Sequence, residues 1–157
     1  MTGGTAFLLL VLLACGLVAA AAMDWRSRII PNWLNALIAL GAIPFWIATR
    51  VPLWPDVAIH VAVAALIFGI FALAFYLGMM GGGDVKMLAA LALWLPPAAV
   101  IQLVVIMSLA GGALTLAMVV RHRMARAEGQ LEIPYGIAIA FAGLWLLGEP
   151  FLNQFVR

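Results

Sequence analysis

The chain has 157 residues, of which 68% are apolar and only 9% carry a charge. A soluble domain is about half apolar and about a quarter charged, and a disordered chain is poor in apolar residues, so both classes are excluded. The formal net charge of +2 is too small to indicate nucleic-acid binding. The apolar runs show no alternation typical of a membrane β-barrel. We therefore expect one all-α membrane domain over residues 1–157, with length for about six crossings of about 20 residues.

The first three crossings are predicted from long runs without charge. The first, Gly3–Met23, has no basic residue before it, so it is interpreted as a retained helix rather than a signal peptide. The second is Trp33–Thr49, and the Pro-rich segment Arg50–Asp56 should form a turn. The third is Val57–Met80, and a last run follows much later at Ile133–Leu147.

The stretch Met87–Val120 also lacks charge, and Pro96 and Pro97 interrupt it. It is too long for one ordinary crossing, and basic residues prefer cytoplasmic loops, which allows a choice between one crossing and two. With two crossings, six basic residues fall on one side (Arg26, Arg28, Lys86, Arg121, Arg123 and Arg126) and two on the other (Arg50 and Arg157). The pattern therefore predicts a polytopic bundle of six helices with the N-terminus outside.

Two aspartates are placed at helix ends on the same predicted side. Asp24 ends the first helix and Asp84 begins the fourth, whereas Asp56 belongs to the opposite side. The fourth helix, predicted over Val85–Leu95, spans only about 17 Å, so Asp84 should lie at or below the membrane surface. Two neighbouring carboxyl groups can share one proton, so that one activates water while the other hydrogen-bonds a substrate carbonyl. A helix-end charge cluster at Asp24 and a helix cap at Asp84 are the structural alternatives.

Three strings resemble signatures of the type IV prepilin peptidases, which are aspartic peptidases of the membrane. Asp24–Asn32 reads DWRSRIIPN, with Pro31 seven residues after the aspartate, and Gly81–Lys86 reads GGGDVK. Ile133–Ala140 reads IPYGIAIA and is similar to the segment that opens the last helix of the family. The resemblance covers nearly the whole chain, and the three segments follow the family order.

The resemblance implies that Asp24 and Asp84 are catalytic. It implies cleavage of the leader peptide of prepilins or pseudopilins at the cytoplasmic face of a bacterial inner membrane. Larger members contain paired CxxC motifs in a cytoplasmic insertion and methylate the new N-terminus; this chain has one cysteine, so it resembles the small peptidases of Tad and Flp pilus systems. The expected partners are a prepilin and the lipid bilayer.

Supporting roles are expected for five further residues of these motifs. Glycines at 81 and 83 permit positive φ and close approach of a substrate backbone. Pro31 and Asn32 should support the start of the second helix, and Lys86 should favour ionisation of a carboxyl group, pair with substrate or anchor the helix at the interface. Arg26 and Arg28 are interpreted as topology determinants.

No metal or other cofactor is expected, because the two histidines fall on opposite predicted sides and no HExxH string occurs. Two other functions remain open from the sequence: a small proton or cation transporter or channel subunit that uses Asp24 and Asp84, and a non-catalytic pilus-assembly protein. A transporter would more often carry its acidic residues in the middle of a helix, whereas both residues here are predicted at helix ends.

Overall fold

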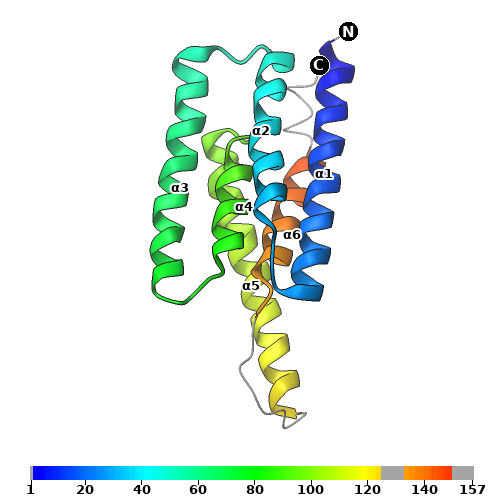
Figure 1. The fold of residues 1–157 in the computed structure, drawn as a ribbon, viewed down its shortest axis with the longest axis vertical. Coiled ribbons are helices and arrows are strands. Elements are labelled where there is room, and N and C mark those ends of the chain that lie inside the picture. Colours follow the sequence, from blue (N-terminus) through cyan, green and yellow to red (C-terminus); the bar gives the residue numbers. More distant parts are fainter. Residues whose placement is uncertain (1, 125–132, 150–157) are drawn as a thin grey trace.

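The computed structural model describes residues 2–124 and 133–149, and this part of the chain is all-α. Six helices run alternately down and up (Figure 1). Their bounds are α1 Thr2–Ser27, α2 Asn32–Thr49, α3 Ala58–Tyr76, α4 Gly82–Ala92, α5 Pro97–Met124 and α6 Tyr135–Gly148. A short kinked turn, η1 Leu53–Val57, joins α2 to α3.

The predicted division of the long uncharged stretch into two helices is confirmed. α4 ends at Ala92, Pro97 begins α5, and the backbone between them turns tightly, with Trp94 N–H bonded to Leu91 O. α4 contains the predicted 11 residues, but it begins and ends three residues earlier than expected. The reason is that Gly82 and Gly83 enter the helix instead of forming the loop before it.

Within the described residues, four segments are long and apolar enough to cross a membrane: Gly3–Ser27, Asn32–Thr49, Leu53–Tyr76 and Pro97–Met124. They expose many large apolar side chains, among them Phe7, Leu40 and Leu66, which is the surface expected against lipid rather than water. The chain is therefore a multi-pass integral membrane protein.

The two short helices, α4 and α6, form the interior of the bundle. α4 packs against α2, α3 and α6, while α6 packs against α1, α4 and α5. Four of the largest fully buried side chains of the described residues come from these two helices: Met87, Leu88, Leu91 and Ile139. Because neighbouring helices cover it, an 11-residue helix can lie at membrane depth without exposing its ends to lipid.

Trp94 fixes the C-terminal end of α4 to α2. Its indole N–H donates a hydrogen bond of 2.8 Å to Ile38 O, and its ring lies 5.2 Å from that of Phe45, centroid to centroid. Gly41 on α2 faces the indole so closely that a Cβ there would lie 2.8 Å from Trp94 Cζ2. Only glycine lets the helix backbone approach the indole ring at this point.

We expect Gly41→Val to lower the free energy of unfolding by about 1–3 kcal/mol, because the branched side chain would overpack a rigid ring. Thermal denaturation in detergent measures the effect. Gly69→Val on α3 is the matched control, since no atom lies within 4 Å of its Cβ position. Equal melting temperatures for the two variants would contradict this account of the α2–α4 contact.

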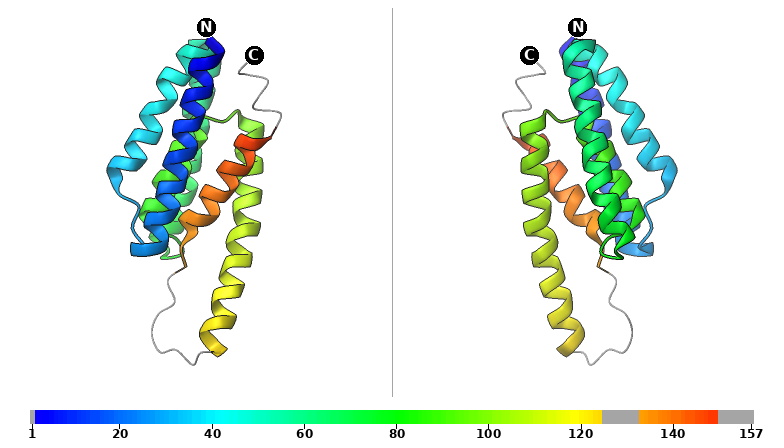
Figure 2. Two further views of the ribbon diagram at one scale, coloured as in Figure 1. Left: turned by 90° about the vertical axis from the view of Figure 1, so that its right-hand side faces the viewer. Right: turned by 90° about the vertical axis from the view of Figure 1, so that its left-hand side faces the viewer.

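The basic residues within the described segments follow the predicted separation. Arg26 and Arg28 lie where α1 ends, Lys86 lies in the first turns of α4, and Arg121 and Arg123 lie in the last turn of α5, which continues beyond the bundle at this end (Figures 1 and 2). Arg50 follows α2 at the opposite end. Arg126 and Arg157 lie outside the described residues.

Candidate active site

Asp24 lies in the last turn of α1, with only 4% of its surface exposed. The helix runs on to Ser27 and ends where Arg28 adopts a left-handed backbone conformation, with φ 57°. The Arg28 N–H still bonds to Asp24 O at 3.0 Å. A left-handed non-glycine residue costs of the order of 1 kcal/mol, so the surrounding structure must hold this sharp change of direction.

Asp84 lies in the first turn of α4 and is 7% exposed. Gly81 is the N-cap residue, and its N–H faces the Asp84 carboxyl group. The unpaired N–H groups of a helix N-terminus favour an acidic side chain at this position. Gly81 and Gly83 do not adopt the positive φ that glycine permits: Gly81 has φ −72°, and Gly83 is helical.

Gly83 lies close to the backbone of the chain itself, so the expected close approach of a substrate backbone stays a prediction. A Cβ on Gly83 would lie 3.2 Å from Ile30 O and 3.2 Å from Ile30 Cβ. On the other side, the buried Asn35 donates a hydrogen bond of 3.0 Å from Nδ2 to Gly83 O. The start of α4 is thus held between the α1–α2 loop and α2.

The fold brings Asp24 and Asp84 together. Both line one cavity of about 230 Å³, between the end of α1, the α1–α2 loop and the start of α4; its other lining residues are Arg28, Ile29, Ile30, Gly81, Gly82 and Gly83. The backbone N–H of Gly136, at the start of α6, faces both carboxyl groups. Each carboxyl group also has one buried oxygen without a hydrogen-bond partner, Oδ2 of Asp24 and Oδ1 of Asp84.

This arrangement can perform acid–base chemistry on a bound molecule. Two buried carboxyl groups this close do not both ionise readily, so one tends to keep a proton while the other stays anionic. Their free oxygens can then accept a proton from water and donate one to a carbonyl oxygen.

Arg28 is placed differently from the sequence-based interpretation. Its side chain lines the cavity and interacts electrostatically with Asp24, in addition to any role in membrane topology. Its Nη1 is buried and has no hydrogen-bond partner, while the guanidinium lies 5.7 Å from the Trp25 ring centroid. A residue that lines the cavity therefore carries a cationic group with one buried donor that has no partner among the described residues.

Of the five supporting residues, Gly81 and Gly83 line the cavity, whereas Pro31, Asn32 and Lys86 lie outside it. Pro31 is the N-cap residue of α2. Asn32 does not bond its local backbone but accepts a hydrogen bond of 2.8 Å from Lys86 Nζ. Both side chains are exposed, and neither lines the cavity that holds Asp24 and Asp84.

Gly136 is the main site residue that sequence reasoning missed. A Cβ there would lie 2.8 Å from Asp24 Oδ2 and 2.7 Å from Ile30 Cδ1, so only glycine fits between them. The IPYG string was a sufficient signal, because it lies at the start of a predicted helix and contains the glycine. Asn35, which holds Gly83, gave no signal, because a lone Asn in an apolar run has many structural roles.

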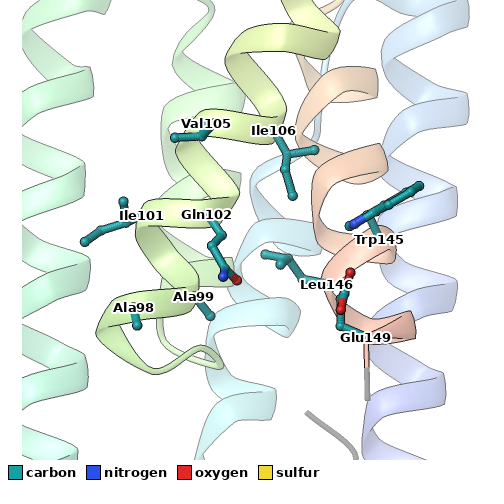
Figure 3. Close-up of a pocket in the computed structure, with 9 residues that line it drawn as sticks. All are labelled: Ala98, Ala99, Ile101, Gln102, Val105, Ile106, Trp145, Leu146 and Glu149. Carbon is teal, nitrogen blue, oxygen red and sulfur yellow. The ribbon is translucent and has the colours of Figure 1, made fainter. Parts of the chain in front are cut away.

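Two other cavities lie at the opposite end of the bundle. One of about 530 Å³, between the start of α5 and the end of α6, is lined by Gln102, Trp145 and Glu149, among others (Figure 3). Another of about 410 Å³ lies between the segment from the end of α2 to the start of α3 and the turn between α4 and α5. Its lining includes Arg50, Asp56 and His60. Asp56 is thus separated from Asp24 and Asp84, as the sequence predicted.

Within residues 2–124 and 133–149, no group of three or more His, Cys, Asp or Glu side chains is arranged to hold a metal ion.

Comparisons with known proteins agree on one family. The model of the type IV leader peptidase family matches residues 11–116. A prepilin leader peptidase/N-methyltransferase of Dickeya chrysanthemi is 36% identical over 132 residues, which cover 80% of this chain and 45% of the relative. One of Burkholderia pseudomallei (strain 1026b) is 32% identical over 151 residues, covering 88% and 46%.

The chain spans less than half the length of these curated relatives. No solved structure matches it. The family match extends from α1 into α5 and contains both Asp24 and Asp84. The chain therefore belongs to the type IV leader peptidase family.

Proposed function

We propose that the chain is a membrane aspartic endopeptidase that removes the leader peptide of a prepilin. The observation that carries the proposal is the shared cavity: Asp24 and Asp84, from helices far apart in the sequence, open onto it, each with a free buried oxygen. The family membership and the names of the relatives support the reaction and its substrate.

The reaction follows from the positions of these groups. The anionic carboxyl group takes a proton from a water molecule in the cavity, and the water oxygen attacks the peptide carbonyl. The neutral carboxyl group donates a hydrogen bond to the carbonyl oxygen as negative charge develops there. The two carboxyl groups act as a unit, so neither role is assigned to one residue.

Arg28 and the backbone N–H of Gly136 contribute to the electrostatics of this site. The guanidinium has a free buried Nη1, which can donate to a substrate carbonyl at the cavity. The Gly136 N–H faces both carboxyl groups and orients them toward one another.

The site faces the cytoplasm in this proposal, with the N-terminus outside and the six helices crossing a bacterial inner membrane. The support is the gathering of basic residues at the end of the bundle that holds Asp24 and Asp84. In the described residues, the acidic side chains lie at helix ends or in turns. This placement favours a reaction at the membrane surface over a path for ions across the membrane.

Co-expression of the chain with a prepilin tests the proposal. We expect the prepilin to lose its leader, with a fall in mass that places the cut just before the apolar helix, as mass spectrometry of the product measures. A prepilin of unchanged mass, recovered from membranes that contain the correctly inserted chain, would contradict a peptidase function.

A further inference from the structure

A second surface, which lies beside α4 on the side away from the carboxyl groups, has the form of a binding groove. α2 and α3 both pack against α4 but make almost no contact with each other (Figure 1). α4 therefore forms the floor of an open groove of about 490 Å³, whose walls are α2 and α3. Below we call it the α2–α3 groove.

The lining of the α2–α3 groove is dominated by alanine. Each of the three helices contributes two alanines: Ala36 and Ala39, Ala64 and Ala65, and Ala89 and Ala90. In a membrane, small residues let the backbone of another helix approach closely, and tight packing then supplies the binding energy. A helix that enters here would also cover Phe68, which is 45% exposed.

Polar groups occur only at one end of the groove, near the start of α4. Asn32 and Lys86 lie there and hydrogen-bond to each other. Asn35 lines the same end, and its buried Oδ1 has no hydrogen-bond partner, although its Nδ2 is bonded to Gly83. A bound polypeptide that leaves the groove at this end would pass the free acceptor Oδ1 of Asn35 and the cationic side chain of Lys86.

The groove and the cavity with Asp24 and Asp84 lie on either side of the N-terminal part of α4. Lys86 lines the groove, Asp84 lines the cavity, and the two residues lie on different faces of the same helix. A helix is about 10–12 Å wide, and an extended chain advances about 3.3 Å per residue. About three or four extended residues therefore cross from the groove, past Gly81–Gly83, into the cavity.

We infer that the α2–α3 groove binds the apolar helix of the prepilin substrate, with the N-terminal end of that helix beside Asn32 and Lys86. This inference rests on the proposed function, because the order of a prepilin, leader first and helix second, fixes the orientation. The helix anchors the substrate between α2 and α3, and the extended residues before it pass the start of α4 to reach Asp24 and Asp84. Cleavage just before an apolar helix follows from this path.

A large side chain in the groove should weaken substrate binding without changing the cleavage step at Asp24 and Asp84. Ala65 lines the groove and is exposed, so Ala65→Trp fills it without disturbing the core; Ala62→Trp, exposed on the same helix but outside the groove, is the control. We expect Ala65→Trp to raise KM for the full prepilin at least tenfold with kcat little changed. A short peptide that ends soon after the cleavage site should be cleaved equally by both variants. Equal KM values for the full prepilin would overturn the inference.

Cross-linking tests the groove independently of cleavage. Cys15 is the only cysteine of the chain, so a Cys15→Ser, Asp84→Asn background accepts a new cysteine at Ala65 or, as control, at Ala62. We expect Ala65→Cys to cross-link to a prepilin with one cysteine in its apolar helix, and Ala62→Cys not to do so. Equal cross-linking from both positions, or none from Ala65→Cys, would overturn the inference. Failure of the wild-type chain to cleave would instead contradict the proposed function.

Discussion

Asp24→Asn and Asp84→Asn should each reduce prepilin cleavage by a factor of about 10⁴, because an amide cannot take a proton from water or share one with its neighbour. The substitution keeps the shape of the side chain. Each carboxyl group is buried and has one oxygen without a partner, so a neutral amide lowers the cost of burial rather than raising it. We therefore expect a melting temperature in detergent equal to or above that of the wild type.

Asp56→Asn is the matched control for this experiment. Asp56 lies in η1 at the other end of the bundle, and its backbone oxygen, which the substitution leaves in place, lies 2.8 Å from Nδ1 of His60. This variant should cleave at the wild-type rate. Full processing by Asp24→Asn or by Asp84→Asn would refute the paired mechanism. A loss of activity that always accompanies a lower melting temperature would assign both residues a structural role.

The all-α fold and the positions of most turns could be predicted because charge is so rare in this chain. Each break in an apolar run carries a charge, a proline or several glycines, and nearly all of these breaks coincide with a turn in the structure. The distribution of basic residues was sufficient to divide the long stretch around Pro96 and Pro97, because topology depends on charge rather than on local geometry. The sequence placed Asp24 and Asp84 on one side, but it left open whether the two carboxyl groups lie close together without substrate.

Local backbone geometry was less accessible to prediction. The three successive glycines were placed before the predicted helix, and Gly81 and Gly83 were expected to permit positive φ, yet Gly82 and Gly83 belong to α4. A side chain at Gly83 would crowd Ile30, and one at Gly82 would crowd Phe75, so close packing rather than a left-handed backbone accounts for these two glycines. Arg28, in contrast, is left-handed, and nothing in its residue type predicts it. Such details depend on tertiary contacts between segments distant in sequence, which a pattern along one chain does not contain.

Outside the two aspartates, we expect substitution of Gly136 to cause the largest loss of activity. It begins the buried helix α6, and its N–H faces both carboxyl groups. Its missing side chain leaves room for Asp24, since a Cβ would lie 2.8 Å from Oδ2 and 3.0 Å from Cγ of that residue. Any larger residue must therefore displace the Asp24 carboxyl group or shift the start of α6.

We expect Gly136→Ala to reduce kcat about 100-fold, since a displacement of about 1 Å at a catalytic group costs a factor of this size. Gly136→Val should reduce kcat further. Gly112→Ala on α5 is the control, because its Cβ position has no atom within 4 Å, and it should retain full activity. The readout is the rate of cleavage of a short leader peptide, which does not depend on the α2–α3 groove. If Gly136→Ala cleaved that peptide at the wild-type rate, the carboxyl groups would have to work from positions other than those seen here.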